Sequence, residues 1–522
     1  MSALLDKKSA QAMLALLLCL LTAFLWKLVP NPAIAVIAGI IPLGILFVLH
    51  QPFLMVLLFV IFSFFRIHEV FPQLYSLKIP LLLSMAALAA LVWHVGLTRK
   101  VEAYWRPELT MLALFLGLVI VGILMASNRP VAVNYFTGIY WKIAVMTVAI
   151  AWLSRTATDF RLASRLITLA GLAVAIVALY NKSMGIGLVE GTRVTIGREI
   201  GSVLGDPNDL ALVLMFPASF AVSLIATQGV GKSSRLLGLL AFIALFLAVI
   251  ATQSRGGLLG IMAVLGIYAY RRMQSKTLFM VLGGIAAILL YAIAGISDRA
   301  SGGSAEEGID ASAMGRLYAW EAAFGMAVDN PLTGVGLNNF YPNYFFYSPH
   351  WDGLNHAVHS TWFGVLAETG FLGLVVFVIA IVMLILSAHR SLRRLEKHRD
   401  CVDPDTHATA QAVFAGMIGT VVSGTFLTQG FTWPIYILAA LIIAAVPNLL
   451  LAAGVGVHVG PAVVGALYIY LPGRALVSSV IDGLANAPLS GLARGLEAVV
   501  TAGLLAIGML VGAGIVAGLG LT

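Results

Sequence analysis

Apolar stretches of about 20 residues recur along almost the whole chain, and a helix of that length spans the hydrocarbon core of a bilayer. Only 10% of the 522 residues are charged, whereas about a quarter are charged in a typical soluble domain. The sequence therefore predicts an all-α polytopic membrane protein with about 12–14 transmembrane helices. The expected spans are 11–29, 33–49, 52–65, 80–97, 109–127, 132–153, 166–180, 207–227, 236–252, 256–270, 277–297, 361–387, 412–430 and 435–452.

The distribution of basic residues predicts the orientation of these spans. The first apolar run follows Lys7 and Lys8 and is expected to be an uncleaved span; a signal peptide cut after Ala35 is the alternative. With the N-terminus inside, the inner loops hold 18 of the 31 basic residues and the outer segments hold ten. Because inner loops are enriched in Lys and Arg, this bias supports the orientation. It also accounts for the net charge of +8 without a nucleic-acid partner.

Three outer segments carry polar residues: about 181–206, the turn at 252–255, and a large loop at 298–360. The loop begins with a polar Gly/Ser-rich stretch that is expected to be mobile. A helix with apolar positions at helical spacing follows and is stopped by Pro331. The aromatic-rich stretch after it suits either the bilayer interface or stacking on sugar rings.

Three residues on the predicted outer side form a plausible catalytic set. Arg255 begins a span beside two glycines that allow a ligand to approach the backbone, Arg316 starts the loop helix, and His359 ends the loop. Arginine grips phosphate oxygens in a bidentate way, so two of them could stabilise a pyrophosphate leaving group without a metal. Histidine titrates near neutral pH and could activate an acceptor hydroxyl. Taken alone, an arginine at a membrane surface is more often a head-group contact, and a single loop histidine more often has no catalytic role; the combination of the three favours a site.

At these positions the sequence resembles the O-antigen ligase family. HSTWFGVLAETGFLG fits a signature of His, then Asn, Ser or Gln, nine residues, Gly, two residues, and Gly, Thr or Tyr; it places His359, Ser360, Gly370 and Gly373. A second signature, Arg with Leu four positions on, fits Arg255 in SRGGLL. GRLYAWEAAFGMAVDNPLTGVGLNNF looks like the start of the family's periplasmic loop, and GDPNDLALVLMFP looks like the segment that opens another family span. The resemblance is good over roughly 190–390 and extends in layout over 1–453.

The resemblance implies a GT-C-like glycosyltransferase in the bacterial inner membrane, with its site on the periplasmic side. It implies metal-independent, inverting transfer from an undecaprenyl-pyrophosphate-linked glycan, without a cofactor. His359 would be the base, and Arg255 and Arg316 would bind the pyrophosphate. The candidate substrate-binding residues are Arg193, Arg198, Asp206, Asn208, Ser360, Tyr318 and Trp320.

Several alternatives stay open. Ser360 stands where Asn is commoner in the signature, and the motif also resembles members associated with protein O-glycosylation and exosortase systems. The acceptor can therefore be a lipid A-core sugar, a growing glycan or a protein hydroxyl, so polymerase and protein O-oligosaccharyltransferase stand beside ligase. A transporter or flippase of the lipid-linked glycan is the alternative from another class, although it would place charges near the bilayer midplane. Glu368 lies inside a span and needs a partner, for which Lys142 is the candidate.

The chain after the core, at 454–522, is rich in Gly and Ala. The segment LPGRALVSSVIDGLANAPLSGLARGLEAVV, from Leu471, is similar to the last spans of the threonine/serine exporter family. The other interpretation is an extra hairpin of closely packed small-residue helices. No function is assigned to this tail.

Overall fold

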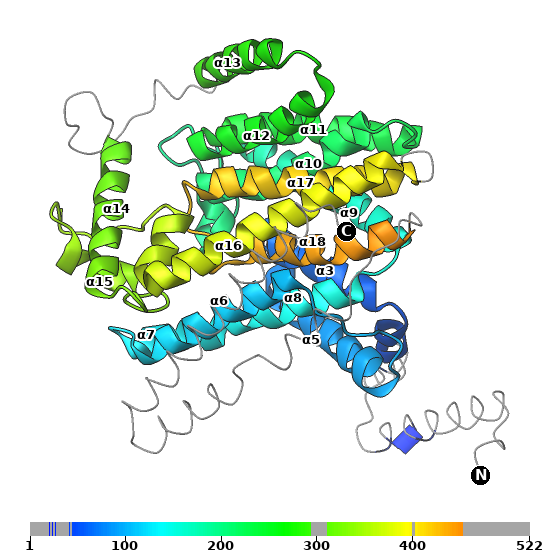
Figure 1. Cartoon of the computed structure of the whole chain (residues 1–522), viewed down its shortest axis with the longest axis horizontal. Helices are drawn as coiled ribbons and strands as arrows, with labels where there is room; N and C mark the ends of the chain where they lie inside the picture. Colours follow the sequence, from blue (N-terminus) through cyan, green and yellow to red (C-terminus); the bar gives the residue numbers. More distant parts are fainter. Residues whose placement is uncertain are drawn as a thin grey trace, which may run out of the picture. The chain divides into compact units, whose positions relative to one another are not determined.

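Helices form the regular structure of the described part of the chain (Figure 1). The structure, a computed structural model, describes residues 44–293, 311–398 and 402–452, with single positions between 20 and 41. The chain divides into two compact units, Met1–Gly456 and Val457–Thr522, and the described residues belong to the first. The elements are α3 (Pro52–Phe64), α4 (Ile67–Val70), η1 (Pro72–Leu77), α5 (Ile79–Leu91), η2 (Val92–Leu97), α6 (Pro107–Leu124), α7 (Arg129–Tyr135), η3 (Phe136–Tyr140), α8 (Trp141–Leu153), α9 (Ala157–Met184), η4 (Arg198–Ile200), η5 (Val203–Gly205), α10 (Pro207–Ala226), α11 (Lys232–Thr252), α12 (Arg255–Arg272), α13 (Lys276–Ile293), α14 (Ala311–Asp329), α15 (Phe340–Tyr347), α16 (Thr361–Lys397), α17 (Pro404–Gly424) and α18 (Trp433–Ala452).

The helices confirm a polytopic membrane protein. Within the described ranges, seven helical segments are long and apolar enough to cross a membrane, or up to eight if a pair bent by 96°, Gly44–His50 with Pro52–Phe64, is one span. Helices α12, α13 and α18 coincide with three other predicted spans, and α17 overlaps a fourth. The predicted span 11–29, most of 33–49, and the Gly/Ser-rich stretch up to residue 310 lie outside the described residues.

Helix α9 begins nine residues before its predicted span and α16 ends ten residues after its own, but among the described helices only α17 is displaced by more than three residues in the same direction at both ends. The sequence predicts a span at 412–430, but α17 begins at Pro404 and ends at Gly424. Asp403 starts the helix early because its carboxylate accepts the Thr406 N–H at 3.3 Å. After Gly424 the chain leaves the helix and forms a loop, residues 425–432, before α18. We refer to this segment as the α17–α18 loop.

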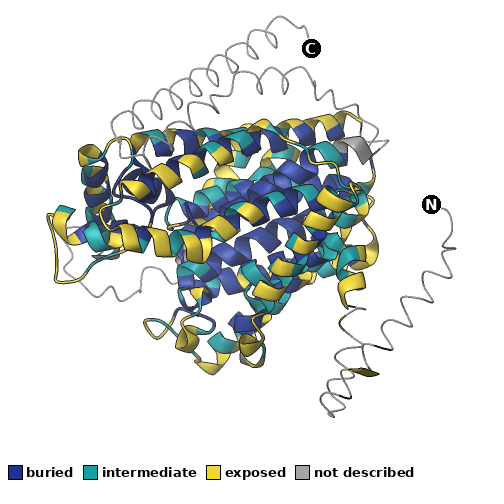
Figure 2. Ribbon diagram, turned by 90° about the horizontal axis from the view of Figure 1, so that it is seen from below, coloured by how far each residue is buried: buried dark blue, intermediate teal, exposed yellow. Residues whose placement is uncertain are grey.

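Helix α10 lies at the centre of the bundle, where small residues let its neighbours approach closely. A Cβ added at Gly171 of α9 would lie 2.2 Å from Pro217 Cβ, and one added at Gly416 of α17 would lie 2.7 Å from Ser219 Oγ. Buried residues fill the interior and exposed ones cover the outside (Figure 2). Large apolar side chains are exposed on α11, as expected of a lipid-facing helix; they are Leu236, Leu239, Leu240, Ile243 and Leu247.

Ion pairs between helices gather at the bundle end that holds the predicted inner loops. Arg165, near the start of α9, lies 3.1 Å from Asp405 in the first turn of α17 and donates to Ser234 of α11 at 2.9 Å. Arg271 at the end of α12 pairs with Glu396 near the end of α16. These ion pairs lie at one end of the bundle, and the candidate site lies at the other end.

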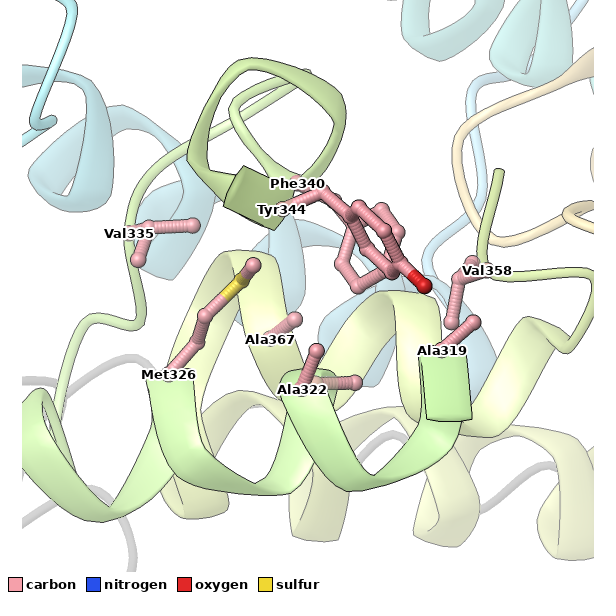
Figure 3. Packing of buried hydrophobic residues seen from close by; sticks show 9 residues of the cluster. Ala319, Ala322, Met326, Val335, Phe340, Tyr344, Val358 and Ala367 are labelled. Atoms are coloured by element: carbon pink, nitrogen blue, oxygen red, sulfur yellow. The ribbon is translucent and has the colours of Figure 1, made fainter. Parts of the chain in front are cut away.

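Two helices of the predicted large loop, α14 and α15, pack on the start of α16 at the other end of the bundle (Figure 1). Phe340 and Tyr344 of α15 point between α14 and α16 (Figure 3). The buried cluster between them consists of Ala319, Ala322, Ala323, Met326, Val335, Phe340, Tyr344, Val358 and Ala367. Alanines on α14 allow this close packing, which fixes α14 against the segment leading into α16.

The structure explains why glycine stands at position 370 of the signature. It adopts φ 69° inside α16 and breaks the helix, so that Phe371 N–H donates to the Pro331 carbonyl at 2.9 Å. On the other side of the break, Val335 N–H donates to the Ala367 carbonyl at 2.8 Å. A Cβ at Gly370 would lie 2.5 Å from the Pro331 oxygen. The break lets the segment after α14 bond to the backbone of a membrane helix.

Candidate functional site

His359 is held from both sides by its neighbours in the chain. It adopts φ 45°, an uncommon conformation for a residue other than glycine. Before it, the buried Val358 accepts a hydrogen bond at 3.0 Å from the Trp320 indole N–H. After it, Ser360 caps α16 by accepting the Phe363 N–H at 3.5 Å. The Trp320–Val358 hydrogen bond and the Ser360 cap thus determine where the imidazole of His359 lies.

The electrostatic surroundings of His359 identify its neighbours. Burial lowers the pKa of His359 below the ordinary 6.5, and the positive charge of Arg316 lowers it further. The negative charge of Asp206 opposes this effect, and His356 adds a small lowering. The structure therefore brings α14, the start of α10 and the start of α16 into electrostatic range of one another. A lowered pKa leaves the imidazole neutral, and able to accept a proton, at neutral pH.

Arg255 is the first residue of α12, at the same end of the bundle. Ser254 caps this helix by accepting the Gly257 N–H at 3.2 Å. The sequence suggested that the two following glycines would let a ligand approach the backbone, but the structure shows otherwise. A Cβ at Gly257 would lie 2.5 Å from the Cβ of Ala211 in α10, and one at Gly256 would lie 3.3 Å from the Cβ of Phe426. These glycines serve helix packing, and this packing places the start of α12.

The α17–α18 loop connects Arg255 with His359. Phe426 contacts the start of α12, and the next residue, Leu427, accepts the Thr361 hydroxyl at 2.7 Å in the first turn of α16. The N-termini of α10, α12 and α16 thus lie together, with Asp206, Arg255 and His359 at or beside them. Helix N-termini carry partial positive charge and favour anions, and two arginines add to that potential.

Three of the candidate substrate-binding residues brace this end of the bundle. Arg193 is 3% exposed; its Nε donates to the Thr252 carbonyl at 3.1 Å and its guanidinium donates to Asn208 at 2.9 Å. Arg193 therefore fastens the turn before Arg255 to the first turn of α10. Arg198 donates to the Gly205 carbonyl at 3.2 Å, directly before α10.

Asp206 and the aromatic candidates also have defined contacts. The carboxylate of Asp206 caps α10 by accepting the Asn208 N–H at 2.7 Å. The Tyr318 ring stacks on His350 with centroids 3.9 Å apart, and the Trp320 ring stacks on Phe363 with centroids 5.1 Å apart. The predicted substrate contacts of these residues stay predictions.

Glu368 has a different partner from the one predicted. Its carboxylate accepts the Asn338 N–H at 2.7 Å and the Phe340 N–H at 3.3 Å, so it caps the start of α15. Lys142 is exposed on α8. Backbone amides can satisfy the hydrogen-bonding needs of a buried carboxylate. Local sequence patterns do not reveal these donors, because they lie about 30 residues from Glu368 in the chain.

Sequence reasoning missed two polar residues that join the helix starts, Gln429 and Thr361. Gln429 donates to Asp209 at 3.0 Å and is 5% exposed. The predicted span 412–430 places Gln429 inside a membrane helix, where its side chain would have no partner from the helix starts. Among the residues that the structure describes, no three His, Cys, Asp or Glu side chains are grouped as ligands for a metal ion.

Comparison with protein families finds two matches. Residues 240–378, which contain Arg255, Arg316 and His359, match a family model described as O-antigen ligase. Residues 401–516 match a model named for threonine/serine export. A search of curated proteins finds no significant match. The first match points to a ligase or polymerase activity of the glycosyltransferase type. The chain is therefore a multi-pass membrane protein whose residues 240–378 are similar to the O-antigen ligase family.

Proposed function

We propose that the protein transfers a glycan from undecaprenyl pyrophosphate to an acceptor hydroxyl on the periplasmic face of the inner membrane. The observation that carries the proposal is that His359, two residues before α16, lies within electrostatic range of Arg316 in α14. The start of α12 is packed against the same group of helix N-termini and brings Arg255 to this end. A neutral base and two guanidinium groups are the groups that such a transfer requires.

In the proposed reaction, His359 accepts the proton of the acceptor hydroxyl as its oxygen attacks the anomeric carbon of the glycan. A new carbon–oxygen bond forms, and the bond between that carbon and the pyrophosphate oxygen breaks with inversion. The electron pair leaves with the pyrophosphate, whose growing negative charge Arg255 and Arg316 stabilise. No oxidant, metal or cofactor is needed for this balance.

The pH profile of transfer should report the surroundings of His359. The acidic limb of kcat/KM is expected below pH 6.5, because burial and Arg316 lower the pKa of the base and only its neutral form is active. Arg316→Gln removes a lowering charge and should move the limb to higher pH. Asp206→Asn removes a raising charge and should move it to lower pH. Rates measured from pH 5 to 8 would contradict the assignment if both variants moved the limb in the same direction.

The match to an exporter model is the observation that favours transport as a second function. Its described part consists of α17, α18 and the loop between them. A Cβ added at Gly260 of α12 would lie 3.1 Å from the Gly419 carbonyl oxygen of α17, so α17 packs closely against the matched ligase-like region. This packing favours α17 as a part of the proposed transferase over α17 as a part of a separate transport domain.

A deletion strain identifies the acceptor. Glycan blots of its lipopolysaccharide and membrane-protein fractions are compared with those of the parent and of a complemented strain. A ladder lost only from lipopolysaccharide, with free lipid-linked glycan accumulating, is the result expected of a ligase. Loss from the protein fraction identifies a protein O-oligosaccharyltransferase, and shortened chains identify a polymerase. Unchanged blots in both fractions would refute transfer.

A further inference from the structure

The α17–α18 loop lies beyond the ligase-like match at residues 240–378, yet it contacts the first turn of α16, directly after His359. The buried Thr361 hydroxyl donates to Leu427 at 2.7 Å and accepts the Gln429 backbone N–H at 3.1 Å. A Cβ at Gly430 would lie 2.4 Å from a methyl carbon of Val365, one turn further along. The loop backbone therefore follows α16 closely.

The side chain of Gln429 connects this loop with α10. Its Nε2 donates to Asp209 Oδ1 at 3.0 Å, and its Oε1 accepts the Thr432 hydroxyl at 2.5 Å. Asp209 lies in the first turn of α10, three residues after Asp206. Because both ends of the amide are bonded and the residue is 5% exposed, its orientation is set.

We propose that Gln429 is a positioning residue for the transfer reaction, which holds the start of α16, and with it His359, against the start of α10. Through its backbone it bonds α16, and through its side chain it bonds α10. This inference rests on the proposed function, because it assigns the base role to His359.

The chemistry of the contact explains the choice of an amide. Asp209 offers an acceptor and Thr432 offers a donor, and one glutamine satisfies both without adding a charge. A carboxylate at position 429 would face Asp209 with like charge and lose the donor. An apolar side chain would leave the buried oxygen of Asp209 without this donor.

The test exchanges the two groups of the contact. Gln429→Glu alone places two carboxylates together, whereas Gln429→Glu with Asp209→Asn restores one amide and one carboxylate in swapped positions. Gln429→Met tests loss of the polar contact at similar volume. Thr420→Val, a buried change in the body of α17, is the control for general destabilisation. Purified proteins are assayed in nanodiscs with lipid-linked glycan and the acceptor that the blots identify.

We expect kcat of Gln429→Glu and Gln429→Met to fall by about 10²-fold with KM nearly unchanged, since a shift of about 1 Å in a catalytic group has that effect. The swapped double variant should recover most of the loss, and Thr420→Val should keep the wild-type rate. Wild-type kcat in both single variants, or an equal loss in Thr420→Val, overturns the inference.

A second readout separates this inference from the proposed function. The rate at which diethyl pyrocarbonate modifies His359, followed by mass spectrometry, reports the placement of the imidazole without any transfer. We expect a several-fold change in Gln429→Glu and return to the wild-type rate in the swapped variant. An unchanged modification rate overturns the positioning role. If His359→Ala transfers glycan as well as wild type while the modification rate of His359 still changes in Gln429→Glu, His359 is not the base. The positioning of His359 by Gln429 would then still hold.

Discussion

Transfer by His359→Ala is expected to fall by about 10²- to 10⁴-fold, the contribution of a positioned general base. The imidazole is the group whose lowered pKa keeps it neutral at neutral pH beside Arg316. Its removal should leave insertion intact, because the fold at this point depends on the Trp320 bond to Val358 and on the Ser360 cap rather than on the ring. Initial rates of glycan transfer in nanodiscs measure the effect.

The control for this change is another histidine of the same loop. His356 bonds Asp352 at 3.0 Å and has the smallest of the four effects on the pKa of His359. His356→Ala should therefore change the rate by less than about tenfold, well below the range expected for loss of the base. Membrane abundance is compared by blotting. Wild-type glycan on the acceptor in His359→Ala would remove this histidine from the mechanism.

Arg255→Lys is expected to lower kcat/KM by about 10²- to 10³-fold, although it keeps the charge. A guanidinium presents a planar fork of donors that matches pyrophosphate oxygens, and an ammonium offers only a point charge. Arg255 opens α12 at the end where α10 and α16 also begin, so the loss should appear in leaving-group stabilisation.

The same substitution at the other end of α12 is the matched control. Arg272→Lys changes the last residue of that helix, about 25 Å from Arg255 along the helix axis at 1.5 Å per residue and at the opposite end of the bundle. It should transfer at the wild-type rate. If Arg255→Lys also kept that rate, Arg255 would be a head-group contact and the pyrophosphate role would fall to Arg316 alone.

Sequence patterns were sufficient to predict that membrane helices form, because a bilayer imposes the same requirement on every span. Backbone groups in lipid must bond within their own helix, so an apolar run of the right length has few alternatives. The patterns failed at 412–430, where Asp403 and the chain after Gly424 set the ends of α17. Apolar content does not mark a helix end, whereas a capping side chain does. The predicted sidedness and the boundary at 453/454 stay predictions.

The candidate residues show the same division. Local patterns singled out His359 and Arg255, because each stands at a predicted junction between a span and an outer segment, and Arg316, because it starts the predicted loop helix. They did not identify Gln429, whose partners Thr361 and Asp209 lie far away in the chain. They also gave Glu368 the wrong partner, since the backbone amides of a distant loop bond it.

The sequence by itself determined that the chain is a bundle of membrane helices and which ionisable residues stand at the span ends, because both depend on hydrophobicity and local spacing. Only the tertiary structure decided that the starts of α10, α12 and α16 lie together, and that the glycines after Arg255 accommodate helices rather than a ligand. Close packing and hydrogen bonds between residues 46 to 170 positions apart determine such arrangements, and no periodicity along the chain records them.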